Sequence, residues 1–168
     1  RLELAYSLLF TLPGTPVIRY GDEIGMGDDL SFSERNCART PMQWSNEPLG
    51  GFTKGDKPIL PVISGGPYGF EHINAAIQRR YPDSLLNWTE RIIRMRKEVP
   101  EVGWGDFAVI PAKDPSILIM RYDWRNNSVL FVHNFAADPK EIAFAAGLKG
   151  ENASNGQLLV NLLSDDHS

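Results

Sequence analysis

Three side chains suited to binding a sugar lie within six positions of this chain. They are Arg39, Gln43 and Trp44, in the run Arg-Thr-Pro-Met-Gln-Trp over residues 39–44. A guanidinium donates paired hydrogen bonds, an amide both donates and accepts, and an indole face packs on C–H groups. Together these groups can hold a polyol. Composition alone leaves a second interpretation open, in which the Pro-Met-Trp cluster only packs a loop.

Two adjacent carboxylates, Asp22 and Glu23, follow a short β-rich run. Hydrolysis of a glycosidic bond with retention needs two carboxyl groups about 5–5.5 Å apart. Neighbouring residues on an extended backbone point to opposite faces, so we do not expect this pair to converge on one bond. The alternative interpretation is structural: Glu23 is a buried, hydrogen-bonded residue that braces the strand end, and Asp22 caps the turn.

The elements that must position these residues begin with a helix over residues 1–12. Its polar residues recur every four positions and form one narrow stripe, which predicts burial on most other sides. Pro13-Gly14 ends the helix, and residues 16–20 read as a strand. Helix, turn and strand in this order are typical of a βαβ unit, so we interpret the chain as the C-terminal part of a longer protein. If the rest is missing, apolar surface on the first helix should be exposed.

A long loop and a second helix come next. Residues 25–80 are rich in Gly, Pro, Asn, Asp and Ser and show no sustained period, except for a predicted helical turn at 73–78. Ordered loops of this length usually carry function. An apolar face interleaved with charged residues then predicts a helix over 83–98, with Asp83 as its N-cap. Pro100 ends it, and the basic residues of its last turns match the helix dipole.

The remainder of the chain predicts an antiparallel sheet or a small sandwich that lacks its last strand. Short β-rich runs separated by turn residues indicate strands near 106–111, 116–124, 128–135, 139–145 and 157–163. Apolar residues alternate with others in the second and third of these runs, which indicates one buried and one wetter face. The second and third of these are joined by a predicted hairpin, with Asn126 and Asn127 suited to positive φ.

Two longer segments carry a family resemblance. Gly14-Thr-Pro-Val-Ile-Arg-Tyr-Gly-Asp-Glu-Ile-Gly-Met-Gly27 followed by Arg35-Asn-Cys-Ala-Arg-Thr-Pro-Met-Gln-Trp44 resembles the end of the catalytic barrel in the α-amylase superfamily of glycoside hydrolases. The likeness is nearest to the trehalose synthase family, and the segments at 24–29 and 61–67 favour it. It implies an α/β plus all-β fold. Residues 1–99 would be the last part of a (β/α)₈ TIM barrel, and 100–168 an antiparallel, sandwich-like C-terminal β domain.

The resemblance also implies roles for individual residues. The nucleophilic Asp, the acid/base Glu and a further Asp of this superfamily belong to earlier strands, so no catalytic residue is expected in this chain. Arg39 would approach the acceptor side of the pocket and help to close it, and Arg35 is a second substrate-binding candidate. An ion pair with Asp28, Asp29 or Glu34 is the alternative interpretation of Arg39. Four residues would have structural roles near the active site: Asp22, Glu23, Gln43 and Trp44.

The implied parent enzyme interconverts maltose and trehalose by retaining, intramolecular glucosyl transfer, whereas the present residues alone would be inactive. Other members of the superfamily remain alternatives, namely an oligo-1,6-glucosidase, a sucrose isomerase or another α-glucosidase. A non-catalytic carbohydrate-binding or assembly domain is an alternative of a different class. The expected partners are an α-glucoside and the rest of the barrel.

Composition narrows the remaining possibilities. The 168 residues are 42% hydrophobic with a formal net charge of −4, which favours neither a nucleic acid nor an anionic membrane as partner. The single cysteine, Cys37, excludes an internal disulfide and is interpreted as a small, partly buried hydrophobe, and cytoplasm is the default compartment. His72, His133 and His167 lack companions at ligand spacing, so no metal site is expected. Superfamily members often bind calcium, and the resemblance places such ligands upstream, leaving this chain without a cofactor.

Overall fold

The computed structural model describes residues 1–145, which divide into two compact units. The sheet unit contains Arg1, Glu3–Pro16 and residues 91–145. The loop unit contains Leu2 and Val17–Glu90. This division differs from the domain boundary predicted between residues 99 and 100, which concerns a longer protein and stays a prediction.

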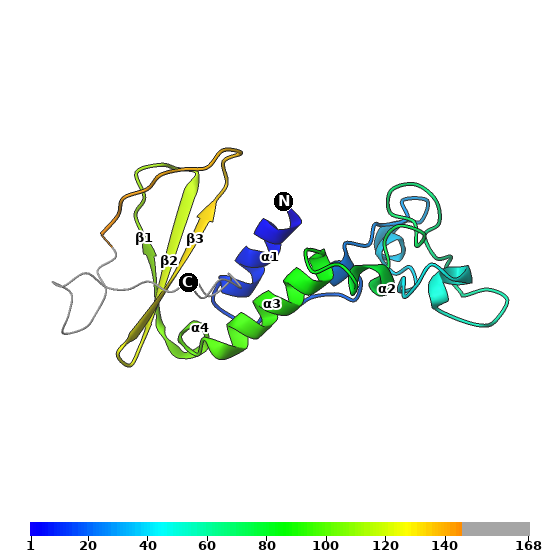
Figure 1. Ribbon diagram of the computed structural model, residues 1–168, viewed down its shortest axis with the longest axis horizontal. Helices are drawn as coiled ribbons and strands as arrows, with labels where there is room; N and C mark the ends of the chain where they lie inside the picture. The colour runs from blue at the N-terminus through cyan, green and yellow to red at the C-terminus, as the bar shows by residue number, and fades with distance from the viewer. Residues whose placement is uncertain (146–168) are drawn as a thin grey trace. The chain divides into compact units, whose positions relative to one another are not determined.

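The sheet unit is built on three antiparallel strands in the order β1-β2-β3 (Figure 1). They are β1 (Asp106–Ile110), β2 (Ile117–Trp124) and β3 (Asn127–Asn134). Pairing joins Phe107 to Tyr122 and Tyr122 to Val129 across the sheet. The predicted antiparallel pairing and the first three predicted strands are therefore confirmed. A second sheet, as a sandwich would require, is not formed by the residues that the structure describes.

The β2–β3 hairpin differs from the prediction in its turn residues. Trp124 pairs with Asn127, so the loop consists of residues 125 and 126 alone. Positive φ occurs at Arg125, with φ 55°, whereas Asn127 is already part of β3. The Arg125 guanidinium lies 4.2 Å from the centre of the Trp124 ring. This cation–π contact stabilises the turn in which Arg125 has positive φ. The Asn126-Asn127 pair in the sequence did not predict it.

Helix α1 (Leu2–Thr11) is joined to the sheet by polar contacts (Figure 1). The Tyr122 hydroxyl donates to the Thr11 carbonyl at 2.6 Å, and the Ser7 hydroxyl lies 2.9 Å from Nε2 of His133. Only Phe10 and Thr11 of the helix are buried, so the predicted burial on most sides is wrong for the described structure. Apolar side chains at this helix remain exposed, such as Leu12 directly after its last residue, which is 43% exposed.

Helix α3 (Leu85–Glu98) confirms the helix predicted over 83–98, and the boundary between the two units falls within it. Its cap differs from the prediction, because Ser84 rather than Asp83 accepts a backbone hydrogen bond, from the Asn87 amide at 3.3 Å. In the last turn the Arg96 guanidinium donates to the carbonyls of Phe10 and Gly14. These bonds satisfy groups at the end of α1 that no intrahelical donor can reach. A single-turn helix, α4 (Glu101–Trp104), leads into β1.

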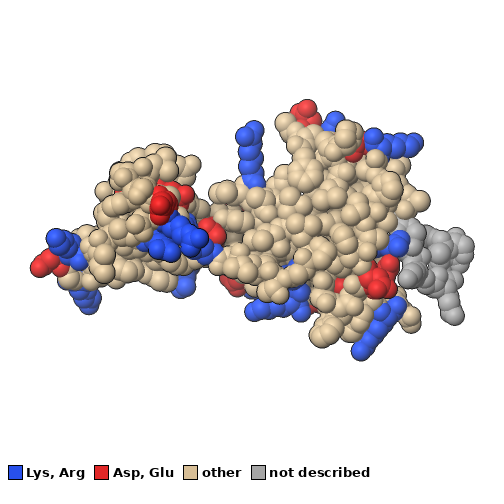
Figure 2. Space-filling view, turned by 180° about the vertical axis from the view of Figure 1, so that it is seen from behind, with Lys and Arg blue, Asp and Glu red and all other residues tan. Residues whose placement is uncertain are grey.

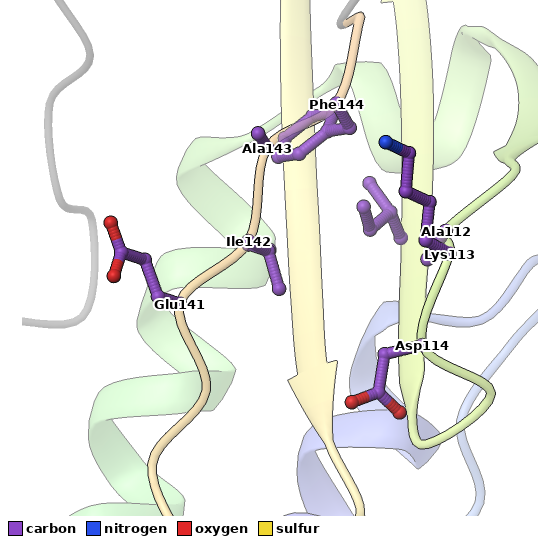
Figure 3. Close-up of a pocket in the computed structure, with 8 residues that line it drawn as sticks. Ala112, Lys113, Asp114, Glu141, Ile142, Ala143 and Phe144 are labelled. Carbon is purple, nitrogen blue, oxygen red and sulfur yellow. The ribbon is translucent and has the colours of Figure 1, made fainter.

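The strand predicted at 139–145 does not form. These residues pair with neither edge of the sheet, and residues 141–144 line a cavity of about 130 Å³ over Ile119 of β2 (Figure 3). Within this segment Ile142 and Phe144 are half-buried while Glu141 and Ala143 are exposed. An extended backbone alternates its side chains whether or not it enters a ladder. The further strand predicted at 157–163 lies outside the described residues.

The surface agrees with the near balance of charge. On the face shown in Figure 2, Lys and Arg side chains are interspersed with Asp and Glu. Within residues 1–145, no helix is both long enough and apolar enough to cross a membrane.

The buried His133 predicts a pH-dependent stability of the sheet unit. Its side chain is 4% exposed, Nε2 contacts Ser7, and Nδ1 has no hydrogen-bond partner. Burial lowers the pKa of His133, and hydrogen bonding to Ser7 opposes this only in part. The unfolded chain, with a histidine pKa of about 6.5, therefore binds a proton more readily than the folded chain.

We expect the free energy of unfolding to fall as the pH drops below about 6.5, the unfolded pKa, and to level off below the folded pKa. The free energy of unfolding can be measured by urea unfolding at pH values from about 8 to about 5, the range in which histidine titrates. His133→Gln should flatten the pH dependence, whereas His72→Gln, at an exposed position, should not. Equal pH profiles for wild type and His133→Gln would contradict the prediction.

Candidate functional site

The loop unit begins with an extended segment and a glycine-bounded turn. Residues 16–20 form no strand, since 16–19 have no regular secondary structure and Tyr20 belongs to a turn, so the predicted strand is not formed there. A single 3₁₀ turn, η1 (Asp22–Ile24), follows. Gly21 and Gly25 flank it with φ of 92° and 71°, a left-handed conformation that glycine adopts without steric cost.

Asp22 and Glu23 therefore lie in a turn and not on an extended strand. The Asp22 carboxylate accepts the Arg19 amide at 2.9 Å, and the Glu23 carboxylate accepts the Gly21 amide at 2.7 Å. Both side chains are half-buried. Because the backbone forms a turn here, the expectation that the two carboxylates point to opposite faces of a strand does not hold. What the contacts do show is that each carboxylate stabilises the local turn.

The side chains of Arg19 and Tyr20 reach a segment about 20 positions further along the chain. The Arg19 guanidinium donates to the Ala38 carbonyl, and the Tyr20 hydroxyl donates to the Thr40 carbonyl at 3.0 Å. Arg19 also forms ion pairs with Asp22 at 3.9 Å and with Asp28 at 3.6 Å. The short helix η2 (Glu34–Ala38) ends at this point. Two consecutive side chains thus fix the backbone on either side of Arg39.

Arg39 and Arg35 are both exposed. No carboxylate of the described chain forms an ion pair with Arg39, so the alternative interpretation through Asp28, Asp29 or Glu34 is not realised. Asp28 pairs with Arg19 instead, and Asp29 accepts the hydroxyl and the amide of Ser31. These two hydrogen bonds lower the pKa of Asp29, because they favour the charged carboxylate.

Gln43 and Trp44 have different environments although they are neighbours. Gln43 is fully buried, and its Nε2 donates to the carbonyls of Tyr68 at 3.1 Å and Ile73 at 2.6 Å. Its Oε1 is buried without a hydrogen-bond partner. Trp44 is 50% exposed, while its amide donates to the Gly50 carbonyl of the turn η3 (Pro48–Gly51). Gln43 thus lies beneath the loop, and half of the Trp44 side chain remains accessible to a ligand.

Sequence reasoning missed the polar residues that hold these loops together. Besides Arg19 and Tyr20, they include Asn74, fully buried, which caps the short helix α2 (Ala75–Gln78) by accepting the Ile77 amide at 2.8 Å. Gln78 donates to the Ile24 carbonyl at 2.7 Å and accepts the Leu86 amide at 3.0 Å. An asparagine directly before Ala-Ala-Ile-Gln was the available signal for the cap.

A small apolar cluster underlies the site. Ile24 of η1, Met42 and Ala75 of α2 are buried together, and Met26, Ile73 and Leu86 pack against them. The cluster joins the turn after the extended segment to the segment that carries Arg39 and Gln43. The candidate site is therefore an ordered loop surface with exposed cationic and aromatic side chains above a buried apolar and amide layer.

Over residues 1–145 no cluster of three His, Cys, Asp or Glu side chains is placed to hold a metal ion. Cys37 is half-buried, and its thiol donates to the Glu34 carbonyl at 2.9 Å. What the arrangement offers chemically is hydrogen bonding and charge from Arg39 and Arg35, with the Trp44 ring as an apolar surface.

Comparison with known proteins identifies relatives of the chain. The family model described as "Alpha amylase, catalytic domain" matches residues 1–105. A trehalose synthase of Thermus thermophilus is 37% identical over 139 residues, covering 81% of this chain and 14% of that protein. The amino acid transporter heavy chain SLC3A1 of Mus musculus is 32% identical over 139 residues, covering 77% of this chain and 20% of that protein.

A solved structure is also similar to this chain. The trehalulose synthase MutB, as its A258V mutant in complex with Tris, superposes with a TM-score of 0.69 at 25% identity, covering 83% of this chain and 30% of that one. The chain thus spans about a seventh of the length of the Thermus relative and less than a third of MutB.

Proposed function

We propose, from the premise that this chain belongs to the α-amylase family, that it is part of an enzyme that interconverts maltose and trehalose. Support comes from the 37% identity to a trehalose synthase across most of the chain. The observation that carries the proposal is Arg39, which is exposed and forms no ion pair within residues 1–145, on a backbone fixed by Arg19 and Tyr20.

The proposed reaction is a retaining glucosyl transfer. A carboxylate nucleophile attacks the anomeric carbon of maltose, the α-1,4 bond breaks, and a carboxylic acid protonates the departing oxygen to release glucose. The glucose turns within the closed pocket, and its anomeric hydroxyl attacks the anomeric carbon of the glucosyl-enzyme. The hydroxyl loses its proton to the carboxylate that had acted as the acid, and the bond to the nucleophile breaks. Trehalose forms, and both carboxyl groups return to their initial states. Water in place of glucose would give hydrolysis.

This chain would supply binding groups to that reaction, and the reacting carboxylates would come from other parts of the protein. Asp22 and Glu23 are committed to backbone amides of their own turn. Arg39 would donate hydrogen bonds to hydroxyls of the released glucose, because a guanidinium presents several N–H groups in a fixed plane. Holding the glucose would favour its re-addition over attack by water.

In this proposal residues 1–99 complete a (β/α)₈ barrel and residues 100–168 form the following β domain, in a cytoplasmic enzyme. The match of the catalytic-domain model to residues 1–105 supports the first part. The antiparallel sheet of β1, β2 and β3 supports the second.

The test is chromatography of the products formed from maltose. We expect trehalose, with some free glucose, from the whole protein that contains these residues, and no turnover from the 168-residue chain alone. Sucrose and isomaltose serve as competing substrates. Faster turnover of either would favour the alternatives, a sucrose isomerase or an oligo-1,6-glucosidase. Turnover by the short chain would contradict the assignment of the reacting carboxylates to other segments.

A second candidate function is supported by the relative named as a transporter heavy chain, namely a non-catalytic binding or assembly role. Under that proposal neither the whole protein nor the short chain converts maltose. Exposed Trp44 gives a direct readout in that case, since bound sugar would change its fluorescence without turnover.

A further inference from the structure

Arg19 and Tyr20 hold the segment that carries Arg39, and we propose that they are positioning residues for this arginine. By positioning Arg39, they would determine how much of the enzyme-bound glucosyl group is transferred to glucose and how much to water. The inference rests on the proposed function, since it assigns a purpose to contacts within the same site. Arg19 and Tyr20 are consecutive, but they lie about 20 positions before Arg39 in the sequence, and only the tertiary contacts bring them to its segment.

Hydrogen bonds fix the backbone on both sides of Arg39. The peptide group that precedes it is bound at both ends: the Ala38 carbonyl accepts from the Arg19 guanidinium, and the Arg39 amide donates to the Asn36 carbonyl at 3.1 Å. On the other side Thr40 is 1% exposed, and its carbonyl accepts from the Tyr20 hydroxyl at 3.0 Å. Arg39 is thus an exposed side chain whose backbone is fixed before and after it. A long side chain on a fixed Cα loses less entropy when a ligand orders it.

Arg19 also forms ion pairs with two carboxylates. Asp28 is a candidate ion-pair partner of Arg39 by sequence, yet it pairs with Arg19 at 3.6 Å. Arg19 also pairs with Asp22 of the turn. By occupying both carboxylates, Arg19 leaves the guanidinium of Arg39 available for neutral hydroxyl groups. Arg19 therefore acts on Arg39 twice, through the Ala38 carbonyl and through the competition for Asp28.

Positioning of Arg39 should affect the ratio of the two products. A positioning contact that matters only after the first bond has broken should affect the fate of the glucosyl group and leave its formation unchanged. Loss of the Tyr20 hydroxyl should therefore lower the ratio of trehalose to glucose among the products while the rate of maltose consumption changes little. A contact that merely stabilised the fold would lower the amount of active enzyme and leave this ratio unchanged.

The experiment uses Tyr20→Phe in the whole protein, with maltose as substrate. We expect the trehalose-to-glucose ratio to fall about two- to tenfold, the range that corresponds to one neutral hydrogen bond. Tyr81→Phe is the matched control, because Tyr81 is 62% exposed and belongs to the same unit. Its ratio should equal that of the wild type. Arg19→Lys, which keeps the charge but loses the planar fork of donors, is a second variant and should shift the ratio in the same direction.

A double variant separates positioning from an independent effect. In Tyr20→Phe combined with Arg39→Ala, the ratio should equal that of Arg39→Ala alone, because a positioning residue has nothing left to position. Additive effects would overturn the inference, and so would Tyr20→Phe and Arg19→Lys ratios equal to that of Tyr81→Phe. In both cases a wild type that makes trehalose leaves the proposed function standing. A wild type that makes none refutes the proposed function, and the inference with it.

Discussion

Replacement of Gln43 by methionine is expected to lower the free energy of unfolding of the loop unit by about 2–4 kcal/mol, since two buried carbonyls lose their donor. Nε2 of Gln43 donates to both Tyr68 and Ile73, and the residue is fully buried. Methionine has nearly the same volume as glutamine, so the change removes the hydrogen bonds without opening a large cavity.

Hydrogen exchange provides a local measurement of this effect. The amides of Ala75 and Ala76 donate to the carbonyls of Gln43 and Trp44, and their exchange should accelerate in Gln43→Met in proportion to the loss of stability. Asn46→Ala is the control, because Asn46 lies on the same segment but is exposed. If Gln43→Met and Asn46→Ala show the same exchange rates, the buried amide does not stabilise the loops, and the predicted support beneath the site is wrong.

The second large effect is expected in the products of Arg39→Ala. In the whole protein this change should lower the trehalose-to-glucose ratio about tenfold or more, the range of one charge-assisted hydrogen bond. Arg39 is exposed and forms no ion pair within the described chain, so its removal should leave the fold intact. Arg39→Lys should recover only part of the ratio, because an ammonium lacks the paired donors of a guanidinium.

Arg80→Ala is the control for a lost surface charge. Arg80 is exposed in the same unit, and only its backbone amide forms a hydrogen bond, to the Ile77 carbonyl. We expect wild-type products from it. A wild-type product ratio in Arg39→Ala would show that this arginine does not contact the acceptor glucose, and Arg35 would then be the next substrate-binding candidate to replace.

Local patterns in the sequence predicted the regular elements well. Helix α3 and the strands β1, β2 and β3 each lie within two residues of the predicted bounds. The helix has an apolar face, and apolar residues alternate in the second and third strands, so these patterns report which side of the element is buried. β-rich composition alone predicted strands at 16–20 and at 139–145, and these residues pair with no strand in the described part of the chain. Such composition is a local property, whereas a strand in a sheet requires a neighbouring edge to pair with.

By itself the sequence determined which side chains could bind a sugar, through residue types within a six-residue run, and where the long helix and the hairpin lie. Only the tertiary structure decided that Arg39 is exposed and has no ion-pair partner among the described residues, that Arg19 forms an ion pair with Asp28, and that Gln43 lies beneath the loop. It also decided that His133 is buried beside Ser7. Side-chain chemistry and backbone preference are local properties that a sequence displays directly. Burial and pairing join residues that are as far as 126 positions apart, and they exist only once the chain has packed.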